Sequence, residues 1–167
     1  LEATDLRGRT FIWLGIEFGP HRKAKHHPTP YLWVASVYAE SLELGEIKKI
    51  EVTPTEKERY TLQIDDVLMV EGHAAIQELG RAAPVTHAAS NLVYQNHLFR
   101  VHTKPQKLDP RFMMYRVNSD AGRNYFRVFG GITSGLNTVG SAQISAIGFP
   151  TRSIDEQVAI ADLVQAI

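Results

Sequence analysis

The sequence predicts an α+β domain with a mainly β core and short helices. Apolar, β-branched and aromatic segments are mixed with helix-capping motifs, without the regular strand–helix alternation of a doubly wound sheet. The chain has 167 residues, of which 44% are hydrophobic and 22% are charged. These values are typical of one globular domain with a sizeable core, and we find no internal repeat or low-complexity segment.

The strands are predicted from composition and from the alternation of apolar and polar residues. Segments of this kind lie at residues 10–19, 31–38, 47–52, 67–70, 91–101 and 142–149. The sequence Ile-Lys-Lys-Ile-Glu-Val at 47–52 alternates, which indicates a half-exposed or edge strand. We expect a polar, basic loop at 21–30 and a loop of small residues at 133–140.

Three helices inside the domain are predicted from their N-terminal capping residues. The motifs are Thr53-Pro54-Thr55-Glu56 for a short helix, Asp109-Pro110 for a helix to about residue 118, and Ser119-Asp120 for a helix over residues 123–129. Gly130 and Gly131 end the last of these helices, because glycine readily leaves the helical conformation.

The last predicted helix begins at a capping box of Ser153 and Glu156, shortly after Pro150. Its apolar residues lie on more than one face, and no glycine or proline ends it. We therefore divide the chain into a domain of residues 1–152 and the beginning of a longer helix at 153–167. The residues expected to face a partner or spacer helix are Val158, Ile160, Leu163, Val164 and Ile167. If so, at least some of the side chains of Ile160, Leu163, Val164 and Ile167 are exposed within this chain.

Composition excludes several classes of protein. The chain has no cysteine, so disulfides, thiolate metal sites and thiol nucleophiles are excluded. It has no apolar run long enough to span a bilayer and no signal-peptide pattern, so we expect a cytoplasmic protein without a membrane partner.

The net charge is zero, but the charges lie in blocks. Acidic residues outnumber basic ones at 40–71, and the reverse holds at 100–127. A second basic cluster contains His21, Arg22, Lys23, Lys25, His26 and His27. Such separation of charge can produce one positively charged face that attracts a polyanion. The alternative is two solvent-exposed faces whose opposite charges sum to zero.

Motifs for several enzyme classes are absent. The sequence has no GxxxxGK[ST] phosphate loop, no GxSxG elbow and no GxGxxG after a strand. The seven histidines leave a metalloenzyme open as an alternative, although they lack the short-range pairing of zinc sites. A nuclease is a weaker alternative, resting on Glu46-Ile47-Lys48 and on the paired Asp65 and Asp66.

An ordered set of short motifs covers nearly the whole chain. The pieces are Leu14-Gly15, Pro30-Tyr31-Leu32-Trp33-Val34-Ala35-Ser36-Val37, Tyr60-Thr61-Leu62, Asp66-Val67-Leu68, Glu71-Gly72, Gly80-Arg81, Gln95-Asn96-His97-Leu98-Phe99-Arg100, Thr133-Ser134-Gly135-Leu136, and Phe149-Pro150 leading to Glu156-Gln157 with Ile160 after it. This order resembles one target-recognition domain from the specificity subunit of type I restriction-modification systems. The family usually has Arg and Asn where Trp33 and Ser36 stand.

The resemblance implies a non-catalytic module that reads one half of a bipartite target in double-stranded DNA. It also implies a second such domain, spaced by long helices that pair as a coiled coil, and partners in the methyltransferase and restriction subunits. S-adenosylmethionine, ATP and Mg²⁺ are expected only in those partners, and no cofactor is expected here. The alternative is a target-recognition module of a fused restriction-methyltransferase enzyme.

Candidate DNA contacts follow from residue chemistry and position. Basic side chains contact phosphates and guanine edges, and Asn, Ser and His in polar loops reach bases or phosphates. The candidates are Arg22, Lys23, Lys25, His73, Arg81, Arg100, Lys104, Lys107, Arg123, Ser134 and Asn137. We assign Gln95, Asn96 and His97 to the structure, because they lie inside a predicted strand between apolar neighbours.

Overall fold

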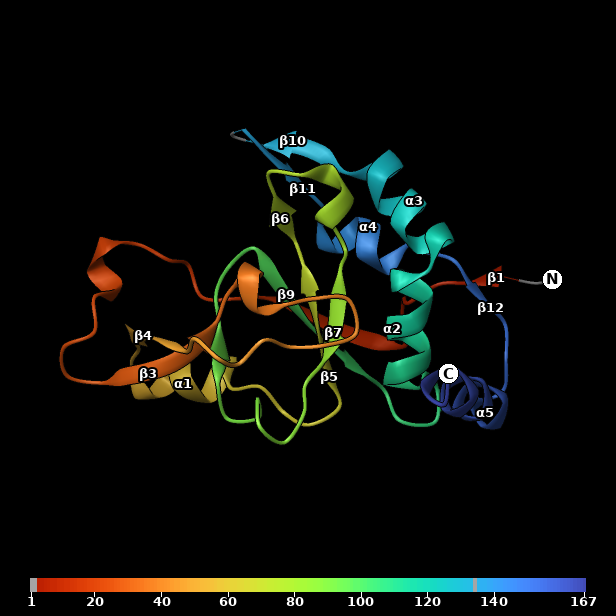
Figure 1. Cartoon of the computed structure of the whole chain (residues 1–167), viewed down its shortest axis with the longest axis horizontal. Coiled ribbons are helices and arrows are strands. Elements are labelled where there is room, and N and C mark those ends of the chain that lie inside the picture. The colour runs from red at the N-terminus through yellow and green to blue at the C-terminus, as the bar shows by residue number, and fades with distance from the viewer. Residues whose placement is uncertain (1–2, 134) are drawn as a thin grey trace.

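The computed structural model describes residues 3–133 and 135–167, and a four-stranded antiparallel sheet lies at its centre (Figure 1). The strands, in spatial order, are β2 (Thr10–Leu14), β9 (Leu98–Thr103), β5 (Asp66–Val70) and β7 (Ala82–Pro84). All five residues of β5 are buried. Because its side chains alternate between the two faces of the sheet, β5 contributes to a hydrophobic core on each side.

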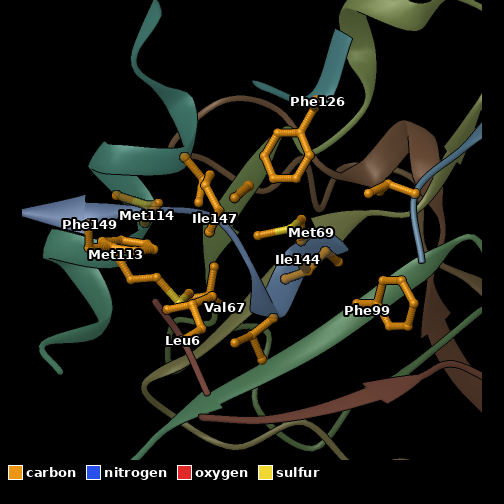
Figure 2. Close-up of a cluster of buried hydrophobic side chains, with 14 of the residues drawn as sticks. Leu6, Val67, Met69, Phe99, Met113, Met114, Phe126, Ile144, Ile147 and Phe149 are labelled. Carbon is orange, nitrogen blue, oxygen red and sulfur yellow. The ribbon is translucent and has the colours of Figure 1, made fainter. Parts of the chain in front are cut away.

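The first core lies between the sheet and three helices, α2 (Pro110–Asn118), α3 (Asp120–Phe129) and α4 (Ser141–Ser145). Val67 and Met69 of β5 meet Met113, Phe126 and Ile144 in this core, as Figure 2 shows. A two-stranded sheet of β1 (Ala3–Thr4) and β12 (Phe149–Pro150) closes the core at one side. The pairing brings segments from the two ends of the described chain side by side.

The second core lies on the opposite face of β5. Leu68 and Val70 pack there with Leu32, Tyr94 and Leu98. A three-stranded sheet adjoins it, in the order β4 (Lys48–Glu51), β3 (Pro28–Leu32) and β8 (Val93–Tyr94), with α1 (Pro54–Tyr60) beside it. This lobe projects from the central sheet on the left of Figure 1.

A third small sheet lies at the top of Figure 1 and contains β10 (Gly131–Thr133), β11 (Leu136–Thr138) and β6 (Gly72–His73). Three 3-10 helices complete the described elements: η1 (Pro20–Arg22), η2 (Val34–Ser36) and η3 (Ile76–Glu78). None of the helices in the described ranges is both long and apolar enough to cross a bilayer.

The α+β fold class is confirmed, as are the capping motifs. Thr53, Asp109 and Ser119 cap α1, α2 and α3, with side-chain oxygens that accept backbone N–H groups. β4 lies at a sheet edge as its alternation predicted, and β5 is the predicted buried strand. These elements were predictable because their signals are local.

Two predicted strands are shorter than expected. The segment 10–19 forms a strand only to Leu14. In place of the strand predicted at 31–38, β3 begins at Pro28 and ends at Leu32. The chain then turns, because the Ser36 hydroxyl accepts the Trp33 N–H at 3.3 Å and the Ser36 N–H donates to the Trp33 carbonyl at 2.9 Å.

Three further expectations are wrong. The segment 91–101 is two strands, β8 and β9, separated by a turn at 95–97. The predicted loop 133–140 contains much of the β10–β11 hairpin. Half of the predicted strand 142–149 belongs to the helix α4, in which Ile144 is buried; Ile147 is buried after the helix, and Phe149 lies in β12. The alternating apolar residues of that segment match the pattern of a strand, but Ile144 of the helix and Ile147 after it both pack into the first core.

The helix α5 (Ile154–Gln165) begins at the predicted capping box of Ser153 and packs on α2. Its buried stripe is Gln157 and Ala161. An ion pair of 2.6 Å joins Arg111 of α2 to Asp162. The predicted exposure is confirmed, because Ile160, Leu163, Val164 and Ile167 are 37%, 67%, 39% and 101% exposed. Val158 is half-buried.

An ion pair between Arg22 and Glu56 ties η1 to the start of α1. Arg22 donates from two nitrogens to the two carboxylate oxygens of Glu56, at 2.7 and 2.9 Å. The carboxylate also accepts the Thr53 N–H in the capping box. The hydrogen bonds from Arg22, followed by that from Thr53, lower the pKa of Glu56 from 4.5 to about 2.

Gly80 has a backbone conformation and a neighbour that only glycine accommodates. Its φ is +70°, and a Cβ at this position would lie 2.1 Å from the ring of Phe126. Phe126 is fully buried in the first core, so its ring has little room to move. Gly8 has a similar φ of +68° but no atom within 4 Å of the Cβ position.

We predict that Gly80→Ala costs about 3 kcal/mol of unfolding free energy, because overpacking adds to the left-handed backbone strain. Gly8→Ala is the matched control and costs about 1 kcal/mol, because it has the strain alone. Urea denaturation of both variants measures the difference. Equal losses in the two variants would contradict the steric explanation.

We predict that the Arg22–Glu56 pair stabilises the fold at neutral pH and that this contribution is lost in acid. Because folding lowers the Glu56 pKa, the contribution is complete above the ordinary pKa of 4.5 and disappears as the pH falls through about 2. Glu56→Gln should cost about 1–2 kcal/mol near neutral pH, a value reduced for solvent screening, and almost nothing near pH 2. Urea denaturation across this pH range tests the prediction, with Glu58→Gln on the same helix as control; a cost for Glu56→Gln independent of pH would refute it.

Candidate nucleic-acid interface

One carboxylate fixes the backbone of the basic loop at residues 23–27. Glu51 of β4 accepts the backbone N–H groups of Lys25, His26 and His27 at 2.7, 3.0 and 2.8 Å. These hydrogen bonds lower the pKa of Glu51. Because the carboxylate binds only backbone groups, the side chains of the loop stay available, and all five residues are exposed.

A group of polar residues from distant parts of the sequence lies together where β6, β11 and the turn at 95–97 meet. We call Glu71, His73, Asn96, His97 and Asn137 the polar loop cluster. Strand β6 pairs with β11, which places His73 opposite Asn137. The His97 carbonyl accepts the Glu71 N–H at 2.8 Å, which joins the turn to the same sheet.

His97 lies in a left-handed turn with φ of +69°. Its Nδ1 lies 3.0 Å from the Glu71 carboxylate, and its side chain is 37% exposed. The close approach of the ring requires Gly72, since a Cβ there would lie 2.8 Å from His97 Nδ1. The prediction that His97 lies inside a strand is therefore wrong, although the run of three polar residues between apolar segments was a signal for a turn.

His73 and Asn137 fix the loop that follows β6. The Asn137 amide donates to the Ala74 carbonyl at 2.7 Å and to the His73 carbonyl at 3.3 Å. The Ala75 N–H donates to His73 Nδ1 at 3.0 Å, which places the proton of a neutral ring on Nε2. The imidazole of His73 is half-buried, and it can present a donor from a fixed backbone.

The turn at 95–97 also contacts the segment that leads to the basic loop. Asn96 accepts the Phe18 N–H through its side-chain oxygen at 3.3 Å and donates its own N–H to the Ile16 carbonyl at 2.7 Å. Phe18 is 50% exposed. Residue 18, which is hydrogen-bonded to the polar loop cluster, is therefore followed within a few residues by the basic loop.

The four arginines predicted to contact DNA all have partners within the domain. Arg22 binds Glu56, and Arg81 pairs with Glu78 and donates to the Val34 carbonyl. The two others cap backbone carbonyls: Arg100 binds the Thr61 carbonyl at 2.7 Å and lies over the Trp13 ring, and Arg123 binds the carbonyls of Leu79 and Gln77. Burial lowers the pKa of Arg123. These guanidinium groups hold the loops in place.

The predicted lysines have a different environment. Lys23, Lys25 and Lys107 are exposed, and within the described residues they form no salt bridge. Lys104 is half-buried and lies over the ring of Phe11, at 4.7 Å from its centroid. Ser134 lies outside the described residues. The DNA contacts of these residues stay predictions.

Beyond this interface, a buried carboxylate at the start of β5 pairs with a histidine of β9. His102 Nδ1 lies 2.8 Å from the buried Asp66, whose other oxygen accepts the Gln63 N–H at 2.8 Å. Across residues 3–133 and 135–167 there is no group of three or more His, Asp or Glu side chains arranged to hold a metal ion. The paired acids Asp65 and Asp66 serve the turn into β5: Asp65 has φ of +69° and Asp66 is 1% exposed.

Comparison with known proteins gives one sequence relative and several structural ones. No family model matches the chain. The specificity subunit of the type I restriction enzyme StySPI from Salmonella potsdam is 25% identical over 124 residues, which are 74% of this chain and 27% of that protein. The chain therefore spans about a quarter of the length of this relative.

Solved structures share the fold. The S subunit of a type I restriction-modification system from M. genitalium has a TM-score of 0.63 at 12% identity, over 99% of this chain and 38% of that one. The HsdS subunit from Thermoanaerobacter tengcongensis also has a TM-score of 0.63 at 12% identity, over 99% of this chain and 37% of that one. The sequence match and the shared fold confirm the prediction that this chain resembles a target-recognition domain of a type I specificity subunit.

Proposed function

We propose that this domain recognises a short sequence in double-stranded DNA, as one half of a bipartite target of a type I restriction-modification complex. The observation that carries the proposal is the polar loop cluster, which the hydrogen bond between Asn96 and Phe18 links to the chain segment leading into the anchored basic loop. Base edges are read by side chains such as Asn and His on fixed loops, and phosphates are bound by exposed lysines. The similarity to a specificity subunit supports the same role.

In this proposal the domain is not an enzyme. Methylation and cleavage, with S-adenosylmethionine, ATP and Mg²⁺, would belong to cytoplasmic partner subunits. The exposed residues Ile160, Leu163 and Val164 of α5, with Ile167 just after it, would pack against another helix of the specificity subunit, which spaces this domain from a second one. Exposed apolar side chains along one helix are typical of such a helix–helix contact.

Selection of duplexes from a random double-stranded library by the purified chain tests the recognition directly. We expect enrichment of one short motif of about 3–5 base pairs, since a single small module buries limited area on DNA. Repeating the selection with the complete specificity subunit and its methyltransferase should give the same motif as one half of a longer target. Failure of both selections to enrich any sequence would refute the proposed function.

We predict that replacing Lys23 and Lys25 by Gln weakens binding to all duplexes to a similar degree, because phosphate contacts carry no sequence information. The slope of log K against log salt should fall in magnitude by about 2. Lys57→Gln with Arg59→Gln removes the same charge from the exposed face of α1 and is the control. A slope that falls equally in both double variants would indicate a general charge effect and contradict a specific role for the basic loop.

We predict that His97→Asn changes the selected motif more than it changes non-specific affinity. Asparagine tolerates the left-handed backbone at this position, so the substitution removes the imidazole and preserves the turn. Loss of one base contact should reduce discrimination at one base pair by about 1–3 kcal/mol. Competition between matched and mismatched duplexes measures this, with His87→Asn on an exposed loop as control. An unchanged motif would exclude His97 from base reading.

A further inference from the structure

A cleft of about 440 Å³ lies where three distant segments meet at the start of α5. Its charged side chains are all cationic: Arg7, Arg9, Lys107 and Arg152. They come from the turn after β1, the β9–α2 connection and the segment between β12 and α5. Of these four residues, only Lys107 was a candidate from the sequence. The cleft shares no residue with the polar loop cluster.

The walls of the cleft are fixed by Gln157, a polar side chain that is only 2% exposed. Its amide nitrogen donates to the Arg152 carbonyl at 3.1 Å and to the Lys107 carbonyl at 3.5 Å. Its oxygen accepts the Asp109 N–H at 3.0 Å. One buried amide therefore holds two cationic segments at a set separation.

Arg9 is fixed to the same connection. Its guanidinium donates to the Lys107 carbonyl at 3.0 Å, and its own carbonyl accepts the Lys104 N–H at 2.7 Å. The Arg7 side chain is 70% exposed, and its pair with Asp5, at 3.2 Å, is a surface contact of little strength. Hydrogen bonds therefore fix the guanidinium of Arg9 and the backbone of Lys107 and Arg152, whereas Arg7 is held only weakly.

The Glu156 carboxylate in the first turn of α5 is not among the residues that line the cleft. Glu156 is turned back into the capping box, where it accepts the Ser153 N–H at 2.9 Å, and this bond lowers its pKa. The Ser153 hydroxyl in turn accepts the Glu156 N–H at 3.3 Å. The positive charge of the cleft therefore comes from its four cationic side chains and not from the helix terminus.

We propose that this cleft binds a phosphate group. Arginine and lysine bind phosphate through charge-assisted hydrogen bonds, and arginine can do so with two parallel bonds. The group could belong to the DNA backbone or to a free phosphorylated small molecule, because both present the same oxyanion. The first source rests on the proposed function, whereas the second does not.

The test combines an anion titration with a DNA titration of the whole chain. Inorganic phosphate, with chloride at equal ionic strength as reference, should shift the amide resonances of residues 7–9, 106–107 and 152–154 in a saturable manner. Arg7→Gln with Arg152→Gln should weaken this binding by roughly tenfold, since charge-assisted hydrogen bonds are lost. Lys57→Gln with Arg59→Gln on α1 should leave it unchanged. Lys107→Gln is a second, independent variant in case the double variant unfolds.

The possible outcomes distinguish failure of the phosphate-binding proposal from failure of the proposed DNA recognition. If phosphate produces no localised shifts, or shifts that persist in the cleft variants, the proposal is overturned even where wild-type chain binds DNA. If the shifts are localised and the salt slope for DNA falls by about 2 only in the cleft variant, the DNA backbone is the source. If they are localised and DNA binding is unchanged or absent, the cleft stands as a site for a free phosphorylated ligand.

Discussion

The structure depends on one strand that is buried on both faces. Val67 and Met69 of β5 belong to the core under the helices, and Leu68 and Val70 belong to the core under the projecting lobe. A shift of one residue in the pairing of β5 would exchange these two sets. The register therefore fixes both cores at once, and two segments of the candidate interface are continuous with strands of this sheet. The turn at 95–97 enters β9, and β6 follows β5 after a single residue.

Charge is used for two separate purposes in this domain. Arginines with internal partners, such as Arg22, Arg100 and Arg123, join segments that lack a regular strand pairing. Their planar guanidinium groups bind carbonyls and carboxylates in fixed geometry, which suits them to that structural role. Lysines such as Lys23 and Lys25 remain exposed on a loop whose backbone is held by Glu51. In this domain the arginines thus hold loops in place, whereas the lysines are exposed on them.

The elements that the sequence predicted well have signals within a few residues. Capping at Asp109 and Ser119 determined where α2 and α3 begin, and both helices end within a residue or so of the expected position. The segment at 142–149 does not form the predicted strand, because the first core takes up Ile144 from the short helix α4 and Ile147 from the residues after it. The polar loop cluster could be predicted in part: His73 and Asn137 were candidates, but their contact joins residues 64 positions apart. The turn at His97 depends on a left-handed backbone and on the missing side chain of Gly72.

The anchoring of α5 has a mechanical consequence. Helix α5 has 12 residues and is therefore about 18 Å long, and it is held near its beginning by Gln157 and near its end by the Arg111–Asp162 pair. A lever of that length converts a tilt of about 10° into a displacement of about 3 Å at its far end. One base-pair step of DNA measures about 3.4 Å along the axis. Two attachment points along the helix therefore restrain tilts that would displace its far end by about one base-pair step.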